Sequence, residues 1–192
     1  MSYIIERNNV YWHQYIALER DLVRIANFIE IHRYNMKTYS IELARLLLLT
    51  CSQVEITGKA IARKLGKKAS NIKDIMNILT ASNPDLASAE VTLPRYAWRT
   101  KPWSSWGEGK TPKWWSAYNR IKHNEVNTLS NGSLRNCIDA LAALLLLTLA
   151  LGHHLMLDAF KPGIELLYPP EILAFPDVST DGEFVNLSDA RK

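Results

Sequence analysis

Apolar side chains recur at three- and four-residue steps over several long stretches, which is the spacing of amphipathic helices. The first stretch covers residues 15–31. A second follows Thr38 or Ser40, either of which can cap a helix, and ends at Gly66, a natural helix stop. Asn71 opens a shorter third helix. No alternating strand pattern and no internal repeat rises above noise, so the pattern predicts a helical protein.

Residues 82–112 interrupt the helical period with prolines and glycines. A loop of this length is uncommon unless it has a function or is pinned to the protein body. Three tryptophans offer large apolar surfaces for pinning it, namely Trp98, Trp103 and Trp106. Thr111 and Pro112 then start a fourth helix, as N-cap and first helical residue.

Asn131 or Ser133 caps a last long helix that begins at Leu134 and extends to about residue 160. The predicted fold class is therefore all-α, a bundle of about four long helices plus a short helix and a long Trp/Pro-rich crossover. We expect a helical domain over residues 1–165. An acidic, proline-containing C-terminal tail over residues 166–192 would form a strap or a partly mobile extension.

Residues 140–151 are the most apolar segment, with Thr148 as the single polar member. A membrane-spanning helix needs about 20 apolar residues, so we expect a buried core helix and no membrane span. The chain has only two cysteines, which excludes a disulfide framework and a four-thiolate zinc site. The N-terminal residues resemble no secretory signal. A cytoplasmic protein with reduced thiols is expected.

Charge is divided unevenly along the chain. Residues 59–123 hold thirteen basic and four acidic side chains, whereas residues 124–190 hold two basic and nine acidic ones. Such asymmetry is typical of a basic surface that meets phosphate and an acidic tail that shields or competes for it, or of two solvated faces that keep the protein soluble. If this basic surface meets a phosphate backbone, as of RNA, the residues that would contact it are Lys59, Arg63, Lys64, Lys67, Lys68 and Arg120.

The standard nucleotide-binding and hydrolase motifs are absent, and the remaining chemistry lies in the segment WWSAYNRIKHNE. Asn119 and His123 are four residues apart, so both project from one face of a helix. An imidazole that titrates near neutrality can take a proton from a ribose 2′-hydroxyl, and Lys122 or Arg120 can offset charge on the reacting phosphate. The alternative is an ordinary amphipathic helix whose Asn–His pair forms hydrogen bonds within the bundle.

The order of the predicted elements resembles the HEPN superfamily, whose motif is an arginine, a polar residue that is often asparagine, three further residues and a histidine. Asn119 and His123 match the polar residue and the histidine, while Tyr118 occupies the arginine position. The segments NMKTYSIELARLLLLTCSQVEITGKAI and WWSAYNRIKHNE are also similar to a group of bacterial HEPN-like proteins. The resemblance spans roughly residues 15–160.

The resemblance implies a metal-independent endoribonuclease that requires no cofactor and acts as a homodimer, with two motifs facing each other. Such enzymes serve in toxin–antitoxin or phage-defence systems, so RNA and a cognate antitoxin or defence partner are the implied partners. The implied catalytic group is His123, supported by Asn119 and flanked by Tyr118 and Lys122. Tyr118 supplies no fixed positive charge at pH 7.

Two other functions fit the same residues. A catalytically inactive HEPN-like module would use the tryptophans and Tyr118 to build a dimer or partner interface. A helical bundle with a small-molecule pocket beneath the Trp-rich crossover is the third possibility. Glu55 is also placed to orient His123 or Asn119, or else to pair with Lys59 one turn away on its own helix.

Overall fold

The computed structural model describes residues 10–123, 128–154, 163–170, 172–173 and 185–186. The all-α prediction is confirmed. The described helices are α1 (Val10–Ala26), α2 (Ile41–Lys64), α3 (Ile72–Ser82), α4 (Ser104–Gly107), α5 (Lys113–Lys122) and α6 (Leu134–His154). Short 3₁₀ turns and two small antiparallel strand pairs connect them, β1 (Val91–Leu93) with β2 (Trp98–Thr100) and β3 (Ile172–Leu173) with β4 (Val185–Asn186).

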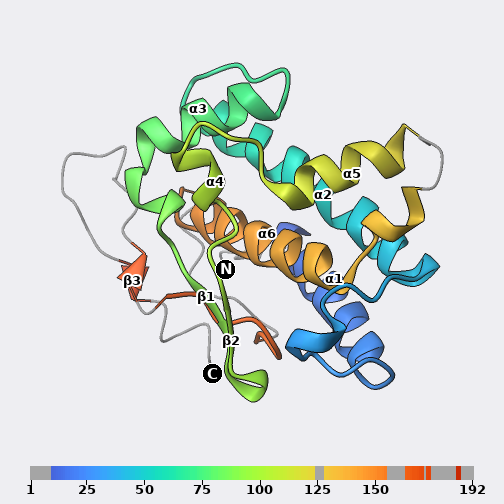
Figure 1. Ribbon diagram of the computed structural model, residues 1–192. Coiled ribbons are helices and arrows are strands. Elements are labelled where there is room, and N and C mark those ends of the chain that lie inside the picture. The colour runs from blue at the N-terminus through green and yellow to red at the C-terminus, as the bar shows by residue number, and fades with distance from the viewer. Residues whose placement is uncertain (1–9, 124–127, 155–162, 171, 174–184, 187–192) are drawn as a thin grey trace, which may run out of the picture.

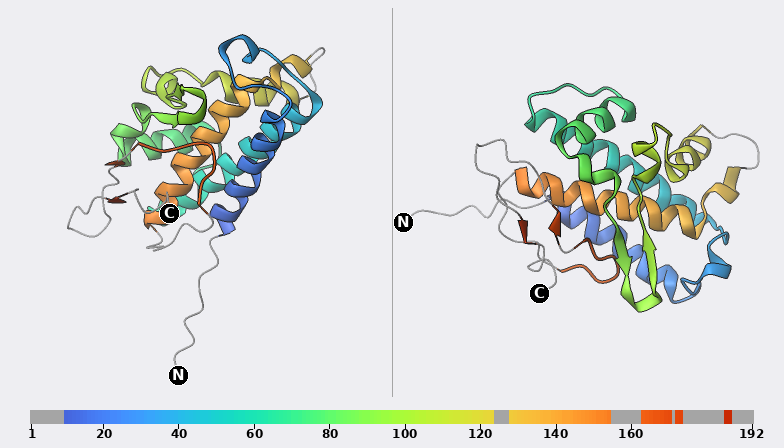
Figure 2. Two further views of the ribbon diagram at one scale, coloured as in Figure 1. Left: turned by 90° about the horizontal axis from the view of Figure 1, so that it is seen from below. Right: turned by 60° about the vertical axis from the view of Figure 1, so that its left-hand side comes forward.

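Helix α6 runs through the middle of the molecule (Figure 1). Helices α1 and α2 lie beside it (Figure 2), and α5 packs across both α2 and α6. Within the described residues one segment, 134–152, is long and apolar enough to cross a membrane by length and composition, and 83% of that window is buried inside the protein. This burial is that of a core helix, as expected from its length.

The helix starts follow local capping signals. The Leu43 N–H donates to Ser40 Oγ over 3.1 Å at the start of α2, and the Asp74 N–H donates to Asn71 Oδ1 over 3.0 Å at the start of α3. Both caps agree with the sequence prediction. At α5 the cap differs from the prediction, because Pro112 itself is the N-cap residue and no side chain caps the helix.

Helix α1 begins and ends about five residues earlier than predicted. The apolar face extends back beyond Tyr15, since Trp12 is fully buried and its ring lies 5.4 Å from the Tyr15 ring. At the other end a turn follows Ala26 and leaves Phe28 in solvent.

The crossover between α3 and α5 is ordered and pinned, as expected. Trp103 is fully buried, and Trp98 and Trp106 are partly buried against the core. The sequence predicted no strands, and this prediction is wrong in the crossover, where β1 and β2 form a hairpin. Strands of three residues are too short to give a readable alternation.

The C-terminal strap, residues 163–170, packs against the bundle. Its apolar residues Ile164, Leu166 and Leu167 are buried in the core. Tyr168 forms two backbone hydrogen bonds with Thr92 of β1, each of 2.8 Å. The packed core thus continues past the expected domain boundary at residue 165. Most of the expected tail beyond residue 170, and the end of the last helix at 155–160, lies outside the described residues.

The two cysteines lie in the core, and burial raises the pKa of both thiols above its ordinary value. Cys137 Sγ also donates to the Leu43 carbonyl oxygen over 3.1 Å. Because the thiolate is the reactive form, both groups are expected to be inert in the folded protein. An aromatic disulfide reagent at pH 8 should label neither thiol in native protein and both after guanidinium unfolding. Rapid labelling of native protein would contradict this placement.

Candidate functional site

His123 is held at the C-terminal end of α5. It is the C-cap residue, and its backbone N–H donates to the Asn119 carbonyl oxygen over 3.0 Å. The His123 side chain is exposed, and that of Asn119, one turn earlier, is half-buried. Hence the predicted pair consists of a solvent-accessible imidazole and, one turn earlier, a half-buried amide side chain.

Tyr118 lies inside the structure and not on the exposed edge of α5. Its side chain is only 5% exposed, and its ring lies 4.9 Å from that of Trp115. Lys122 Nζ lies 5.3 Å from the centroid of the same ring, a cation–π distance. Tyr118 therefore contacts the ammonium group of Lys122, the residue before His123 in the sequence, and supplies no charge itself.

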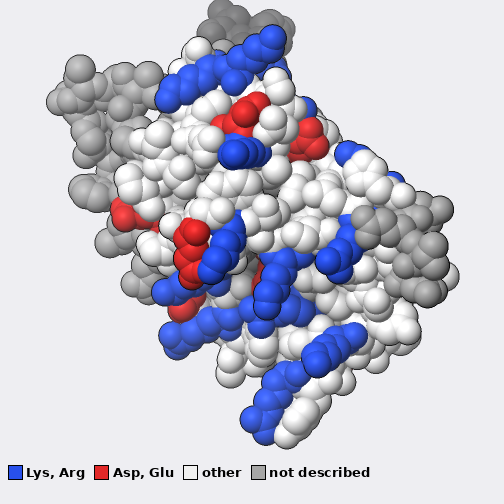
Figure 3. All heavy atoms as spheres, turned by 45° about the horizontal axis from the view of Figure 1, so that its top comes forward, with Lys and Arg blue, Asp and Glu red and all other residues white. Residues whose placement is uncertain are grey.

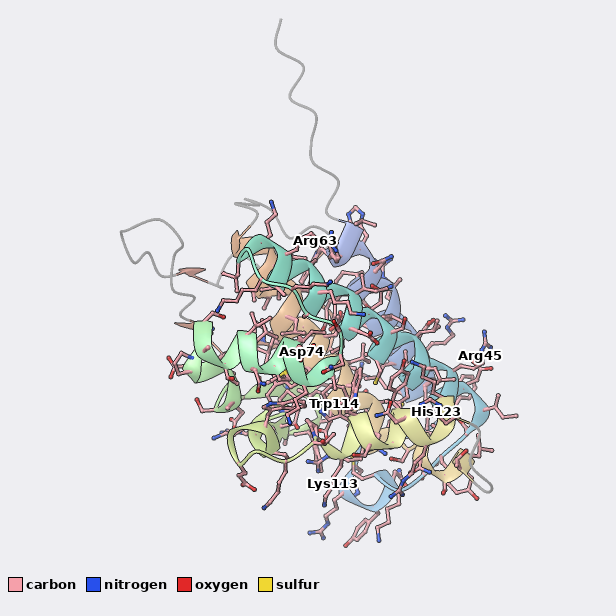
Figure 4. The ribbon with its side chains drawn as sticks, turned by 90° about the horizontal axis from the view of Figure 1, so that it is seen from above. Arg45, Arg63, Asp74, Lys113, Trp114 and His123 are labelled. Carbon is pink, nitrogen blue, oxygen red and sulfur yellow. The ribbon has the colours of Figure 1, made fainter. Side chains whose placement is uncertain are left out.

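The basic residues expected to bind RNA fall into two separate groups. Arg120 shares α5 with His123, whereas the exposed residues Arg63, Lys64, Lys67 and Lys68 surround the C-terminal end of α2. Arg45 and Arg63 are eighteen residues apart on α2, about 27 Å along the axis. Figure 4 places His123 nearer to Arg45 than to Arg63. The basic run consequently does not meet His123 within one chain.

Glu55 pairs with Lys59, which lies one turn later on α2. Its Oε1 is 2.6 Å from Lys59 Nζ, and both side chains are partly buried. Of the two interpretations of Glu55, the ordinary helical ion pair is the one found. Lys59 is therefore engaged with a carboxylate and not freely presented to phosphate.

A polar hollow of about 350 Å³ lies where the crossover meets α5 and α6, and sequence reasoning placed no charged site there. Its basic lining residues are Arg99, Lys101, Lys113 and Arg135. They come from β2 and the residue after it, the start of α5 and the first turn of α6. The sequence offered two indications of such a surface, the excess of basic residues over 59–123 and the possible small-molecule pocket beneath the crossover. Among the described residues, no group of three or more His, Cys, Asp or Glu side chains is arranged to hold a metal ion.

No protein-family model, curated protein or solved structure matches this chain.

Proposed function

We propose that this protein is an RNA-directed, metal-independent endoribonuclease of the HEPN type. The observation that carries the proposal is the exposed imidazole of His123, with the Asn119 amide one turn before it and the Lys122 ammonium held over the Tyr118 ring. Proton transfer and charge stabilisation are the two kinds of help that RNA cleavage needs in the absence of a metal.

In the proposed reaction a ribose 2′-oxygen attacks the adjacent phosphorus while His123 takes the 2′-hydroxyl proton. The bond from phosphorus to the 5′-oxygen breaks, and that oxygen leaves with a proton from a second acid, which in a homodimer is the partner's imidazole. Lys122 offsets the negative charge that builds on the phosphate oxygens, and Asn119 orients the phosphate through its amide. The products are a 2′,3′-cyclic phosphate and a 5′-hydroxyl.

We further place this activity in the cytoplasm, in a toxin–antitoxin or phage-defence system, with RNA and a cognate antitoxin or defence partner as its partners. These settings rest on the resemblance to HEPN proteins. The separation of Arg63 from His123 favours a dimer. The basic residues at the end of α2 do not reach the imidazole of their own chain, whereas those of a second copy can.

Replacing His123 with alanine is expected to reduce RNA cleavage at least about a hundredfold, the usual contribution of a general acid–base group. The measurement incubates full-length protein with mixed RNA in EDTA, follows fragment lengths, and checks the 3′ ends for a cyclic phosphate that resists phosphatase until acid opens it. His13→Ala is the matched control, because His13 is exposed on α1. The His13→Ala protein should cleave RNA at the wild-type rate. Equal cleavage by the two variants would exclude His123 as the catalytic group.

A second candidate function is an inactive partner-binding module. It is favoured by three apolar side chains on one face of α2, Ile41, Leu49 and Ile56, which are each 46–66% exposed. Apolar patches of this kind mark protein interfaces. Wild-type protein that leaves RNA intact at high concentration, yet forms a dimer by light scattering, would support this module over the nuclease.

A further inference from the structure

The polar hollow beside the crossover has an unusual electrostatic composition. Its lining includes four basic side chains and two acidic ones, Glu90 and Asp139. Figure 3 shows Lys and Arg side chains gathered on this face of the molecule, with Asp and Glu side chains among them. The function of the hollow depends on whether the two carboxylates already neutralise the cations.

Asp139 is fully engaged by its neighbours. Arg135 Nε donates to one carboxylate oxygen over 2.8 Å, and Thr100 Oγ1 donates to the other over 2.6 Å. The Asp139 side chain is only 14% exposed, so it lies deep in the hollow. Glu90 lies 3.5 Å from Arg99, at the long end of the ion-pair range. Each acid is therefore matched by one arginine.

Two lysines remain as unmatched positive charges. Lys101 and Lys113 line the hollow, both are exposed, and neither forms an ion pair within the described part of the chain. The hollow consequently carries a net positive charge close to two units.

Arg135 adds a cation that is already held in position. Its Nε is bound to Asp139, and its Cζ lies 5.1 Å from the Trp98 ring centroid. The two terminal nitrogens of a guanidinium can still donate when Nε is occupied. An arginine fixed on both sides loses little side-chain entropy when it binds an anion.

The start of α5 lies at the same place. Pro112, Lys113 and Trp114 line the hollow, no side chain caps the helix, and its first turn contains no acidic residue. The first backbone N–H groups of a helix lack partners within it and favour negative charge. This adds a donor array to the three side-chain cations.

We propose that this hollow is a binding site for a phosphate group, with Lys101, Lys113 and Arg135 as its cationic ligands. A phosphate presents three or four oxygens, so it can meet the arginine fork and both lysines at once, which the two oxygens of a carboxylate cannot do as well. The volume also admits the sugar that carries such a phosphate. The phosphate belongs either to a small phosphorylated molecule or to an RNA backbone.

The site is separate from His123 and does not depend on the proposed nuclease activity. The two lie at opposite ends of α5, ten residues and about 15 Å apart along the helix. An RNA strand lying along α5 would reach both places, and a small ligand would occupy the hollow alone.

The test is calorimetric titration of full-length protein with four probes: adenosine 5′-monophosphate, adenosine, citrate, and a 2′-O-methyl hexaribonucleotide with a 5′-hydroxyl, which resists cleavage. The double variant Lys101→Gln/Lys113→Gln should weaken phosphate binding about tenfold or more, as loss of charge-assisted hydrogen bonds does. Lys37→Gln/Lys73→Gln is the matched control, because it removes the same charge from exposed lysines elsewhere and should bind within about twofold of wild type.

Tight binding of the mononucleotide alone identifies a small phosphorylated ligand, and tight binding of the hexanucleotide alone identifies an RNA backbone; both support the site. Three results would overturn it: adenosine or citrate binding as tightly as the phosphate probes, unchanged binding by the Lys101/Lys113 variant, or no wild-type binding at millimolar concentration. His123→Ala should bind adenosine 5′-monophosphate as wild type does, because a small ligand occupies the hollow alone, so failure of the nuclease proposal and failure of this one are distinguishable.

Discussion

Glu19→Ala is expected to lower the free energy of unfolding by about 3–5 kcal/mol, because it leaves several buried hydrogen-bond donors without an acceptor. Glu19 is fully buried on α1. Its carboxylate accepts backbone N–H groups of Glu165, Leu166 and Leu167 at 2.8, 3.1 and 2.9 Å. The Tyr15 hydroxyl donates to the same group over 3.1 Å.

This carboxylate is the principal polar anchor of the C-terminal strap. The nearby ion pair between Arg20 and Glu165 spans 3.1 Å, but both side chains are about half exposed. Exposed pairs of this kind contribute about 0–1 kcal/mol. Three backbone N–H groups that lose a buried acceptor cost more than that, so Glu19 and not Arg20 decides whether the strap stays attached.

Two further variants grade the effect. Glu19→Gln keeps one oxygen that can replace Oε1, the acceptor for Leu166, Leu167 and Tyr15, and loses only the acceptor for Glu165. Tyr15→Phe leaves the carboxylate intact and should cost about 1 kcal/mol. We expect Glu19→Ala to lower the free energy of unfolding most, Glu19→Gln less, and Tyr15→Phe least.

Urea unfolding measures this series. With a slope near 2–3 kcal/mol per molar urea, Glu19→Ala should move the midpoint down by about 1–2 M. Hydrogen exchange should show faster exchange at Leu166 and Leu167 in Glu19→Ala than in wild type. A wild-type midpoint and unchanged exchange in Glu19→Ala would mean that the apolar contacts of the strap and its backbone hydrogen bonds with Thr92 hold it without Glu19.

The anchor also shows which features of the fold the sequence could not predict. The caps at Ser40 and Asn71 are local, because each side chain binds a backbone group three residues away. Glu19 binds groups 146–148 residues away, and in the sequence it is one more polar position on an amphipathic helix. Local patterns therefore predicted the helices, and long-range polar contacts were found only in the folded chain.

The same division applies to the candidate site. The four-residue spacing of Asn119 and His123 was sufficient to place them one turn apart on α5. The separation of His123 from Arg63 depends on how α5 crosses α2, and no local pattern encodes a crossing. The hollow lined by Lys101 and Arg135 likewise exists only because the crossover folds back onto α6.

Trp114→Ala is the second substitution with a large expected effect, about 3–5 kcal/mol, as for other buried tryptophans. Trp114 is 2% exposed, and its Nε1 donates to the Pro102 carbonyl oxygen over 2.9 Å. Its ring packs edge-on against Trp103 at 5.1 Å and against Trp115 at 5.8 Å. It therefore joins the crossover to α5, and both segments carry the lysines of the hollow.

Trp114→Phe separates the two contributions of the indole. It keeps most of the apolar ring and its aromatic neighbours, but leaves the Pro102 carbonyl without its donor, so the expected cost is about 1–3 kcal/mol. Phe28→Ala is the matched control for removal of an aromatic ring. Phe28 is 86% exposed, and its loss should change stability by no more than about 0.5 kcal/mol.

Thermal unfolding and near-ultraviolet circular dichroism measure the series. A loss of 3–5 kcal/mol from a chain of this length should lower the melting temperature by about 6–20 °C. The aromatic dichroism signal should fall in Trp114→Ala and remain unchanged in Phe28→Ala. If Trp114→Ala has the same melting temperature as Phe28→Ala, then Trp103 and the hairpin hold the crossover in place and Trp114 is not needed for this. If Trp114→Phe loses affinity for phosphate but keeps the wild-type melting temperature, the indole sets the geometry of the hollow.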